Sequence, residues 1–366
     1  MAMRLEAHAP AKSPQIADAA KASHADGVGL SLSWNAIEPN PPAPDGTHTY
    51  AWDDSSFDKM VNALRDAKVK LLTVRISDPP EWAVKGKVCK YKACPPTRAH
   101  YDDFRDFVQA AVSRYGPSGT GKADVRHWSL WNEPNKKKEW GGEDAADGSY
   151  KEYSDLLVPF HAAVKSADQG QAGDRTKVDA GELAAGGGHG ANRPRGWTVD
   201  FNRYNKARGR NDIYDLVTIH AYSATPHDVV DKINNYEKVF TAHHVAITEF
   251  GWSVGRGSGP SRWKCVSSEP AQAAKLEHTV KEVRRAGRLE YVPWLVWFNG
   301  IDNKLDRGRG APEPKCETTT GYQESVGPYM NTFGLYRRDP SGSMATLPPR
   351  PVRDAFLKAA DHTPAE

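Results

Sequence analysis

Two glutamates each follow an apolar run and precede a residue that ends a strand. Glu133 lies in the segment LWNEPN, directly before a proline, and Glu249 lies in ITEFGWS, just before a glycine. A proline cannot extend a hydrogen-bond ladder, so the chain must leave the sheet after Glu133. A carboxyl that gives a proton, paired with one that attacks carbon or activates water, can cleave a glycosidic bond. An exposed carboxylate or a salt bridge to a helix end is the alternative for a single glutamate, but the paired motifs favour chemistry.

The segments around these glutamates alternate between short apolar runs and amphipathic stretches. Such alternation predicts a parallel sheet whose strands are covered by helices. We predict strands over 27–34, 69–76, 125–131, 177–184, 215–221, 245–250 and 292–298, and helices over 57–68, 101–115, 150–167, 197–207, 229–240, 271–286 and 350–360.

The predicted strands number seven, one short of a closed barrel. We expect the missing first strand within Met3–His8, where the pattern is weak, followed by a first helix at Gln15–Ala25. The segments after the strands are long and those after the helices are short, as in a barrel that builds its site from βα loops. We therefore predict an α/β fold, a single-domain (β/α)8 TIM barrel over 1–366. An open doubly wound sheet is the alternative, but no glycine-rich dinucleotide motif follows a strand.

The two glutamate motifs, with His220-Ala221-Tyr222 at the end of a strand between them, resemble those of clan A glycoside hydrolases. The segments SLSWNAIEP, DPPEWA and NTFGLYRRD are similar to barrels of glycoside hydrolase families 39 and 5, and the resemblance covers about residues 27–360. It implies hydrolysis with retention of configuration. Glu133 would be the general acid/base and Glu249 the nucleophile.

The resemblance also implies roles in substrate binding. Asn132 would donate to the substrate 2-hydroxyl, and Tyr222 would hold the nucleophile ionised through a hydrogen bond. His220 would line the same wall, with a satisfied buried histidine as the alternative. Trp297 would form the platform of the innermost sugar subsite, because an indole can stack on a pyranose face. Trp34 is a further candidate for a subsite wall, with core packing as the alternative.

Three other side chains are weaker candidates near the barrel mouth. Glu38 and Trp82 could line subsites or simply pack. Arg75, on the predicted strand over 69–76, would place a cation near the mouth. It could bind a substrate hydroxyl or carboxylate, but we favour a pair with a buried acid.

Other chemistries find no support in the sequence. The run Gly186–Gly190 lacks the Lys and Ser/Thr of a phosphate loop. The pair His243-His244 lacks a third metal ligand, and no serine sits in a G-x-S-x-G elbow. We therefore predict neither a cofactor nor a metal.

Composition is that of a globular protein, with 39% hydrophobic and 26% charged residues. A net charge of +3 is too small to predict nucleic-acid binding, and no apolar segment is long enough to span a membrane. The 11 Trp and 14 Tyr suit flat sugar faces and an ordinary core equally well. We expect a monomer whose partner is a carbohydrate.

The four cysteines lie in polar, Gly/Pro-rich stretches typical of loops. Of three possible connectivities, Cys89–Cys94 with Cys265–Cys316 needs the least crossing, and four free thiols are the alternative. Disulfides imply an oxidising compartment, so we predict a secreted, extracellular protein. The N-terminus, however, lacks the apolar stretch of a signal peptide.

These observations lead to one main hypothesis and two alternatives. The main hypothesis is an enzyme that cleaves β-O-glycosidic bonds in a polysaccharide or oligosaccharide. The alternatives are a catalytically inactive sugar-binding protein on the same scaffold and a transglycosylase. The presence of both glutamates favours an enzyme over the inactive protein.

Overall fold

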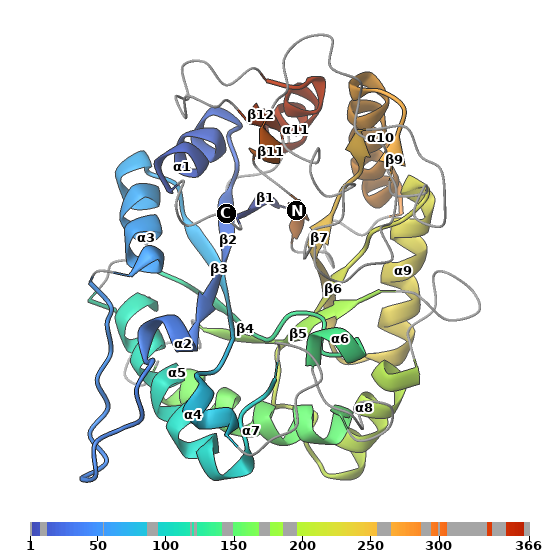
Figure 1. Cartoon of the computed structure of the whole chain (residues 1–366). Coiled ribbons are helices and arrows are strands. Elements are labelled where there is room, and N and C mark those ends of the chain that lie inside the picture. The colour runs from blue at the N-terminus through green and yellow to red at the C-terminus, as the bar shows by residue number, and fades with distance from the viewer. Residues whose placement is uncertain are drawn as a thin grey trace.

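Eight parallel strands form a closed barrel surrounded by helices (Figure 1). The computed structural model describes residues 2–7, 13–53, 55–85, 94–117, 119–120, 123–140, 149–167, 176–185, 196–254, 265–286, 294–298, 301–305, 335–338 and 349–361.

The barrel closes through the weakly patterned first strand. Strand β1 pairs with β10 on one side and with β2 on the other, and the order around the barrel is β1-β10-β7-β6-β5-β4-β3-β2. The prediction of a (β/α)8 barrel is confirmed, including the eighth strand near the N-terminus. The barrel strands are β1 (Ala2–Ala7), β2 (Gly27–Ser33), β3 (Leu71–Ser77), β4 (His127–Leu130), β5 (Lys177–Ala184), β6 (Leu216–His220), β7 (His244–Phe250) and β10 (Trp294–Trp297).

The helices lie outside the barrel, and three of the main helices begin at a side chain that caps them. Ser55 and Ser268 each accept a backbone N–H of the first turn, and Thr225 forms a capping box with Asp228. This box starts its helix three residues before the predicted start at residue 229. The main helices are α1 (Ser13–Ala22), α3 (Ser56–Ala67), α5 (Tyr101–Tyr115), α7 (Ser149–Ala167), α8 (Gly196–Ala207), α9 (Pro226–Val239), α10 (Glu269–Arg285) and α11 (Pro351–Asp361).

Several short elements were not predicted because they are too brief to show a periodic pattern. Three of them, α2, α4 and α6, follow directly or closely after the strand ends β2, β3 and β4. They are α2 (Trp34–Ile37), α4 (Glu81–Val84), η2 (Arg98–His100), α6 (Lys137–Trp140), β8 (Ser253–Val254), β9 (Cys265–Val266), β11 (Ile301–Leu305) and β12 (Tyr336–Arg338).

The inside of the barrel is filled by side chains that meet across it. At the start of the strands, the rings of His127 on β4 and Trp294 on β10 lie 4.4 Å apart, although these strands are not neighbours. Arg4 on β1 lies over Trp294 at 4.0 Å and donates to Thr73 on β3. This end of the barrel is therefore a packed floor, and the opposite end, where the strands finish, is the mouth.

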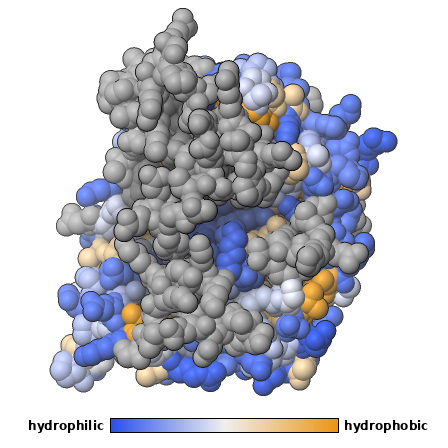
Figure 2. All heavy atoms as spheres, turned by 45° about the vertical axis from the view of Figure 1, so that its right-hand side comes forward, coloured by the Kyte–Doolittle hydropathy of each residue, from blue (hydrophilic) through white to orange (hydrophobic). Residues whose placement is uncertain are grey.

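The described surface is mainly polar. Figure 2 shows hydrophilic side chains over most of the described part of one face, with hydrophobic ones scattered among them. Scattered apolar side chains are normal on a globular protein. No described helix is both long and apolar enough to cross a membrane.

Candidate active site

Glu133 reaches the mouth through an unusual backbone turn after β4. Trp131 and Glu133 have φ angles of 67° and 44°, which residues other than glycine rarely adopt. Asn132, between them, forms a bridge with Glu182, and the Glu133 N–H donates to the Glu182 carbonyl at 2.9 Å. The strand therefore ends at Leu130, one residue before the predicted end. Each such residue costs about 1–3 kcal/mol, and the surrounding bonds must hold it in place.

Asn135 clamps this turn onto the neighbouring strand. Its amide Nδ2 donates to the Ala184 carbonyl, and the Ala184 N–H donates to its Oδ1, both at 2.9 Å. The side chain is buried, so both bonds are shielded from water. The sequence analysis did not assign a role to Asn135, whose place in the NEPN motif was its only signal.

Glu249 lies at the end of β7, and its side chain is buried. The Tyr222 hydroxyl donates to its Oε2 at 3.0 Å, which is the contact that the resemblance implied. The bond orients one carboxylate oxygen and favours the ionised form.

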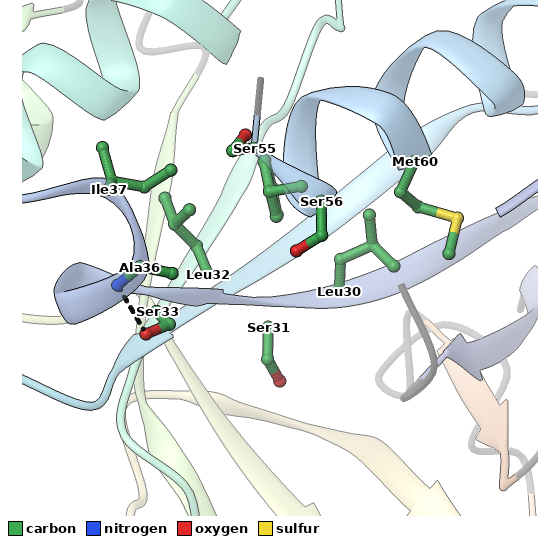
Figure 3. A pocket seen from close by; sticks show the side chains of 10 residues that line it. Leu30, Ser31, Leu32, Ser33, Ala36, Ile37, Ser55, Ser56 and Met60 are labelled. Carbon is green, nitrogen blue, oxygen red and sulfur yellow. Dashed lines mark hydrogen bonds between the residues drawn. The ribbon is translucent and has the colours of Figure 1, made fainter. Parts of the chain in front are cut away.

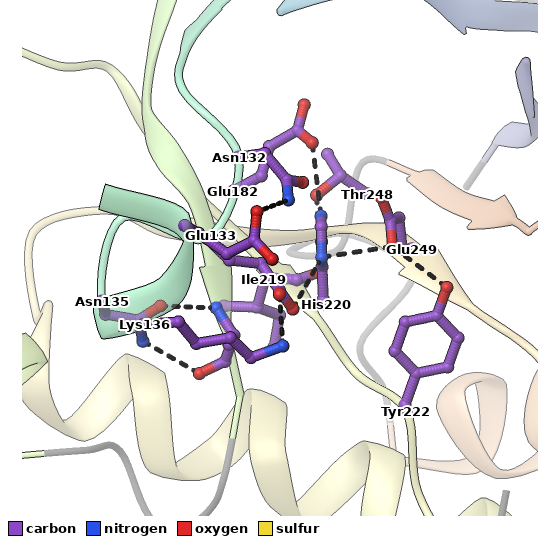
Figure 4. A network of polar contacts seen from close by, with 12 residues as sticks. Asn132, Glu133, Asn135, Lys136, Glu182, Ile219, His220, Tyr222, Thr248 and Glu249 are labelled. Atoms are coloured by element: carbon purple, nitrogen blue, oxygen red, sulfur yellow. Dashed lines mark hydrogen bonds and ion pairs between the residues drawn. The ribbon is translucent and has the colours of Figure 1, made fainter. Parts of the chain in front are cut away.

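His220, at the end of β6, joins the two predicted catalytic glutamates (Figure 4). Its Nδ1 lies 3.1 Å from Glu133 Oε1 and 3.2 Å from Glu249 Oε2. The side chain is only 1% exposed. Because both oxygens contact the same nitrogen, they are at most roughly 6 Å apart. The structure thus brings together the residues that the sequence motifs singled out.

A third carboxylate, Glu182 on β5, completes this cluster and was not predicted. Its Oε2 lies 3.2 Å from His220 Nε2 and accepts from Arg75. Glu182 sits within the strand segment VDAGELA, away from any recognised motif. The available signal was a charged residue in an otherwise buried strand, which is costly without a partner.

Arg75 supplies the matching positive charge from β3. It pairs with Glu182, lies 3.6 Å from Glu249 Oε1 and donates to Ser31 Oγ at 2.6 Å. The prediction that Arg75 pairs with a buried acid is confirmed.

The charge state of His220 follows from these neighbours. Burial lowers its pKa, but Glu249, Glu133 and Glu182 outweigh burial and raise the pKa to about 10. The ring is therefore an imidazolium at neutral pH. Burial also raises the pKa of Glu182, but the Arg75 and His220 charges outweigh it and hold that pKa below its usual range.

The two predicted catalytic carboxyls have opposite pKa shifts. Burial raises the pKa of Glu133, but the adjacent Lys136 ammonium and His220 outweigh it, so the pKa lies well below its usual range. Burial raises the pKa of Glu249 despite His220 and Arg75. In the free protein Glu133 is therefore the more easily ionised of the two. A general acid must hold its proton when the nucleophile is ionised, so catalysis needs the pKa of Glu133 to lie above that of Glu249. The Lys136 side chain is 36% exposed and so has room to move away from Glu133.

One group of ligand-type side chains among the described residues has spacing suited to a metal ion. The ligand atoms of Glu182, His220 and Glu249 lie within 4.8 Å of one another. Arg75 already contacts both carboxylates, and a protonated His220 has no lone pair for a metal. The chemistry of these residues therefore fits a buried network of ion pairs with Arg75 and His220 better than it fits a metal site.

Trp297 lies buried against other aromatic side chains. It is 0% exposed, and its ring lies 5.4 Å from Phe250 and 6.4 Å from Trp252. Stacking on a pyranose needs an open ring face, so the burial of Trp297 favours a packing role, and its role as a platform stays a prediction. The next residue, Phe298, instead lies 6.1 Å from the ring of Tyr222.

Trp34 is also a core residue. It is 0% exposed, donates to Glu38 Oε2 at 2.7 Å and stacks on Phe107 with ring centroids 5.7 Å apart. Trp82 meets Trp34 edge to face at 5.3 Å. For Trp34, which is fully buried, the packing alternative fits the structure. Trp82 is half-buried, and its place in a subsite wall stays a prediction.

The substrate contact of Asn132 and the disulfide pairing of the cysteines stay predictions. The Asn132 amide donates to Glu139 Oε2 at 3.3 Å, and its bond to a substrate hydroxyl is untested. Among the described residues no cysteine is a free thiol. Cys94 is buried, whereas Cys89, Cys316 and the side chain of Cys265 lie outside the described residues.

A separate cavity of about 130 Å³ lies between β2 and α3 (Figure 3). Ser33 and Ser55 on its wall already cap helices α2 and α3. The other lining side chains are largely aliphatic, including Leu30, Ile37 and Met60. The cavity brings no titratable group to its wall, so it is not the candidate active site.

The sequence matches no protein-family model and no curated protein. Solved structures are similar in fold. The AHE enzyme from Alicyclobacillus herbarius has a TM-score of 0.65 at 11% identity, over 97% of this chain and 87% of that one. The β-glycosidase from the hyperthermophile Thermosphaera aggregans has a TM-score of 0.61 at 14% identity, over 96% and 84%.

A family 39 glycoside hydrolase from the gut symbiont Bacteroides cellulosilyticus has a TM-score of 0.62 at 18% identity. The match covers 98% of this chain but spans only 63% of the length of that protein. These neighbours agree with the resemblance to family 39 and related barrels. At such identities the likeness concerns the fold.

Proposed function

We propose that the chain is a retaining glycoside hydrolase that cleaves β-O-glycosidic bonds in a polysaccharide or oligosaccharide. The supporting observation is that Glu133 and Glu249 contact the same nitrogen of His220 at the mouth of a parallel barrel. Retaining enzymes hold their carboxyls about 5–5.5 Å apart, and inverting enzymes about 6.5–9.5 Å. The shared contact with one His220 nitrogen brings an oxygen of each carboxyl close together, which supports the retaining arrangement.

The first step forms a covalent glycosyl-enzyme. A carboxylate oxygen of Glu249 attacks the anomeric carbon while the bond from that carbon to the glycosidic oxygen breaks. The proton of the Glu133 carboxyl passes to the departing oxygen, which leaves as an alcohol. In the second step Glu133, now ionised, takes a proton from water. The water oxygen attacks the anomeric carbon and releases Glu249.

Lys136 must leave Glu133 before the first step can occur. While the ammonium contacts the carboxylate, it stabilises the ionised form, which cannot donate a proton. Substrate that enters the mouth next to Glu133 would displace this partly exposed side chain. Asn132, on the same turn, remains our candidate for the substrate 2-hydroxyl.

The same proposal includes a secreted, monomeric enzyme of polysaccharide degradation with the two loop disulfides predicted from the sequence. Non-reducing peptide mapping of natively secreted protein tests the pairing of Cys89 with Cys94 and of Cys265 with Cys316. Four alkylated thiols would remove the argument for an extracellular location.

The stereochemical outcome tests the mechanism directly. A panel of aryl β-glycosides and polysaccharides first identifies a substrate, and proton NMR then follows the anomer that forms first. We expect the β-anomer before mutarotation. Early appearance of the α-anomer would rule out Glu249 as the nucleophile, and the absence of turnover on the whole panel would favour a sugar-binding protein.

A further inference from the structure

Glu182 is a buried carboxylate in the cluster around His220. Neither the sequence motifs nor the proposed mechanism assigns a role to it. It is 3% exposed and lies on β5, between the strand that carries Glu133 and the strand that carries His220. A charge in this position must be compensated, since an isolated buried carboxylate is costly. Its compensation comes from two cations, Arg75 and His220.

Both cations also face the predicted nucleophile. Arg75 Nη1 lies 3.6 Å from Glu249 Oε1, and His220 Nδ1 lies 3.2 Å from Glu249 Oε2. Each oxygen of Glu249 therefore has one positive neighbour. Both neighbours are anchored at the same atom, Oε2 of Glu182 (Figure 4 shows the His220 contacts).

The protonation of His220 depends on having an acceptor at each nitrogen. A neutral imidazole has one N–H donor, whereas an imidazolium has two. Nδ1 faces Glu133 and Glu249, and Nε2 faces Glu182. If the acceptor at Nε2 were removed, the His220 ring would need only the proton on Nδ1. The ring would then be neutral, and Glu249 would lose a positive neighbour.

We propose that Glu182 is a positioning residue that holds His220 doubly protonated and Arg75 in place, so that both cations keep the Glu249 carboxylate ionised and oriented. This inference rests on the proposed function for its kinetic part only. The charge state of His220 can be measured without turnover. Besides Glu182, the charged groups that face His220 are Glu133 and Glu249, and Arg75 lies beside them.

The decisive variant is Glu182→Gln, which keeps the shape but removes the negative charge. The amide oxygen can still accept hydrogen bonds, but it carries no negative charge to balance the two cations. We expect the ¹⁵N shifts of the His220 ring, assigned by their absence in His220→Gln, to change from imidazolium to neutral imidazole at pH 7.5. Removal of a residue that orients a functional side chain typically lowers activity by about 10–100-fold, and we expect kcat/KM to fall by that factor.

A pH profile separates this role from simple structural support. The His220 charge lowers the pKa of Glu249, so a neutral ring should raise that pKa and move the acidic limb of kcat/KM to higher pH in Glu182→Gln. The control is Asp58→Asn, which removes another largely buried carboxylate, bonded to Tyr115 and Arg114 rather than to the cluster around His220. That variant should change stability without altering the pH profile or the His220 shifts.

Three results would overturn the inference. One is an imidazolium at pH 7.5 in Glu182→Gln. Another is unchanged kcat/KM with an unchanged pH profile. If Glu182→Gln does not fold, the wild-type titration still decides, because a His220 that is neutral at pH 8 contradicts the proposal. If no glycoside is cleaved at all, the proposed function fails while the NMR measurement still tests Glu182.

Discussion

The same kinds of side chain meet at both ends of the barrel interior, with different results. At the mouth, Glu133, Glu182 and Glu249 surround His220, and each carboxylate has a cationic partner. At the floor, Asp179 is 0% exposed, and neither of its oxygens accepts a hydrogen bond within the described part of the chain. His127 Nδ1 lies 3.6 Å from Asp179, beyond hydrogen-bond distance.

The difference lies in geometry rather than in composition. The mouth groups sit where strands end, on the face from which such barrels build their sites, and their polar atoms converge on His220. The floor groups sit where strands begin and are covered by Trp294 and Arg4. Burial without a close partner raises the pKa of Asp179 and favours its neutral form. A cluster of titratable residues is thus a candidate for catalysis only where it is both paired and accessible.

Replacement of the mouth carboxylates should have the largest effect and should distinguish them from each other. Glu249→Ala should abolish turnover on every substrate, because no covalent intermediate can form. Glu133→Ala should lose about 10²–10⁴-fold on substrates with poor leaving groups and much less on activated aryl glycosides, which need little protonation. Kinetics across a series of leaving groups measures this contrast. Equal losses on all of them would contradict the assigned roles.

Trp297→Ala tests whether Trp297 packs in the core or contacts substrate at the mouth. Because the ring packs against Phe250 and Trp252 without an exposed face, we expect a loss of about 3–5 kcal/mol in the free energy of unfolding. The kinetics of the folded fraction should stay close to wild type. Melting and kinetics are measured on the same sample. A stable variant with lowered kcat and kcat/KM would restore the platform role.

The sequence was sufficient for the barrel because strand and helix patterns repeat along the chain and each motif is local. It identified Glu133 and Glu249 through their strand-end motifs, and it anticipated the buried partner of Arg75. It missed Glu182 because the contacts of that residue come from strands far apart in sequence, 107 residues away for Arg75. It did not anticipate the full burial of Trp297, because a strand pattern does not show how neighbouring side chains such as Phe250 and Trp252 cover a ring.

Lys136→Met tests whether Lys136 sets the ionisation of the predicted acid/base, Glu133. Lys136 lowers the pKa of Glu133, so its removal raises that pKa, and the proton-donating form persists to higher pH. The alkaline limb of kcat/KM, which reports the free enzyme, should therefore move upward in pH. Each unit of displacement corresponds to about a tenfold gain on the alkaline side. Lys206→Met, on the exposed surface of α8, is the control for loss of one positive charge. A profile unchanged in Lys136→Met would mean that Lys136 does not set this ionisation.

Asp179→Asn tests the floor and should have the smallest effect on activity. The pKa of Asp179 is raised in the folded state, so the folded protein binds the proton more tightly than the unfolded chain does. The folded state therefore gains stability as pH falls toward the raised pKa, and it pays for a buried charge at neutral pH. Asparagine cannot ionise, so the variant should be as stable as wild type or more stable at pH 7, with the difference shrinking toward pH 4. Chemical unfolding at both pH values measures this change, and kcat/KM should stay within about twofold because Asp179 makes no hydrogen bond to the mouth carboxylates. A large loss of activity without a loss of stability would show that floor and mouth act as one electrostatic unit.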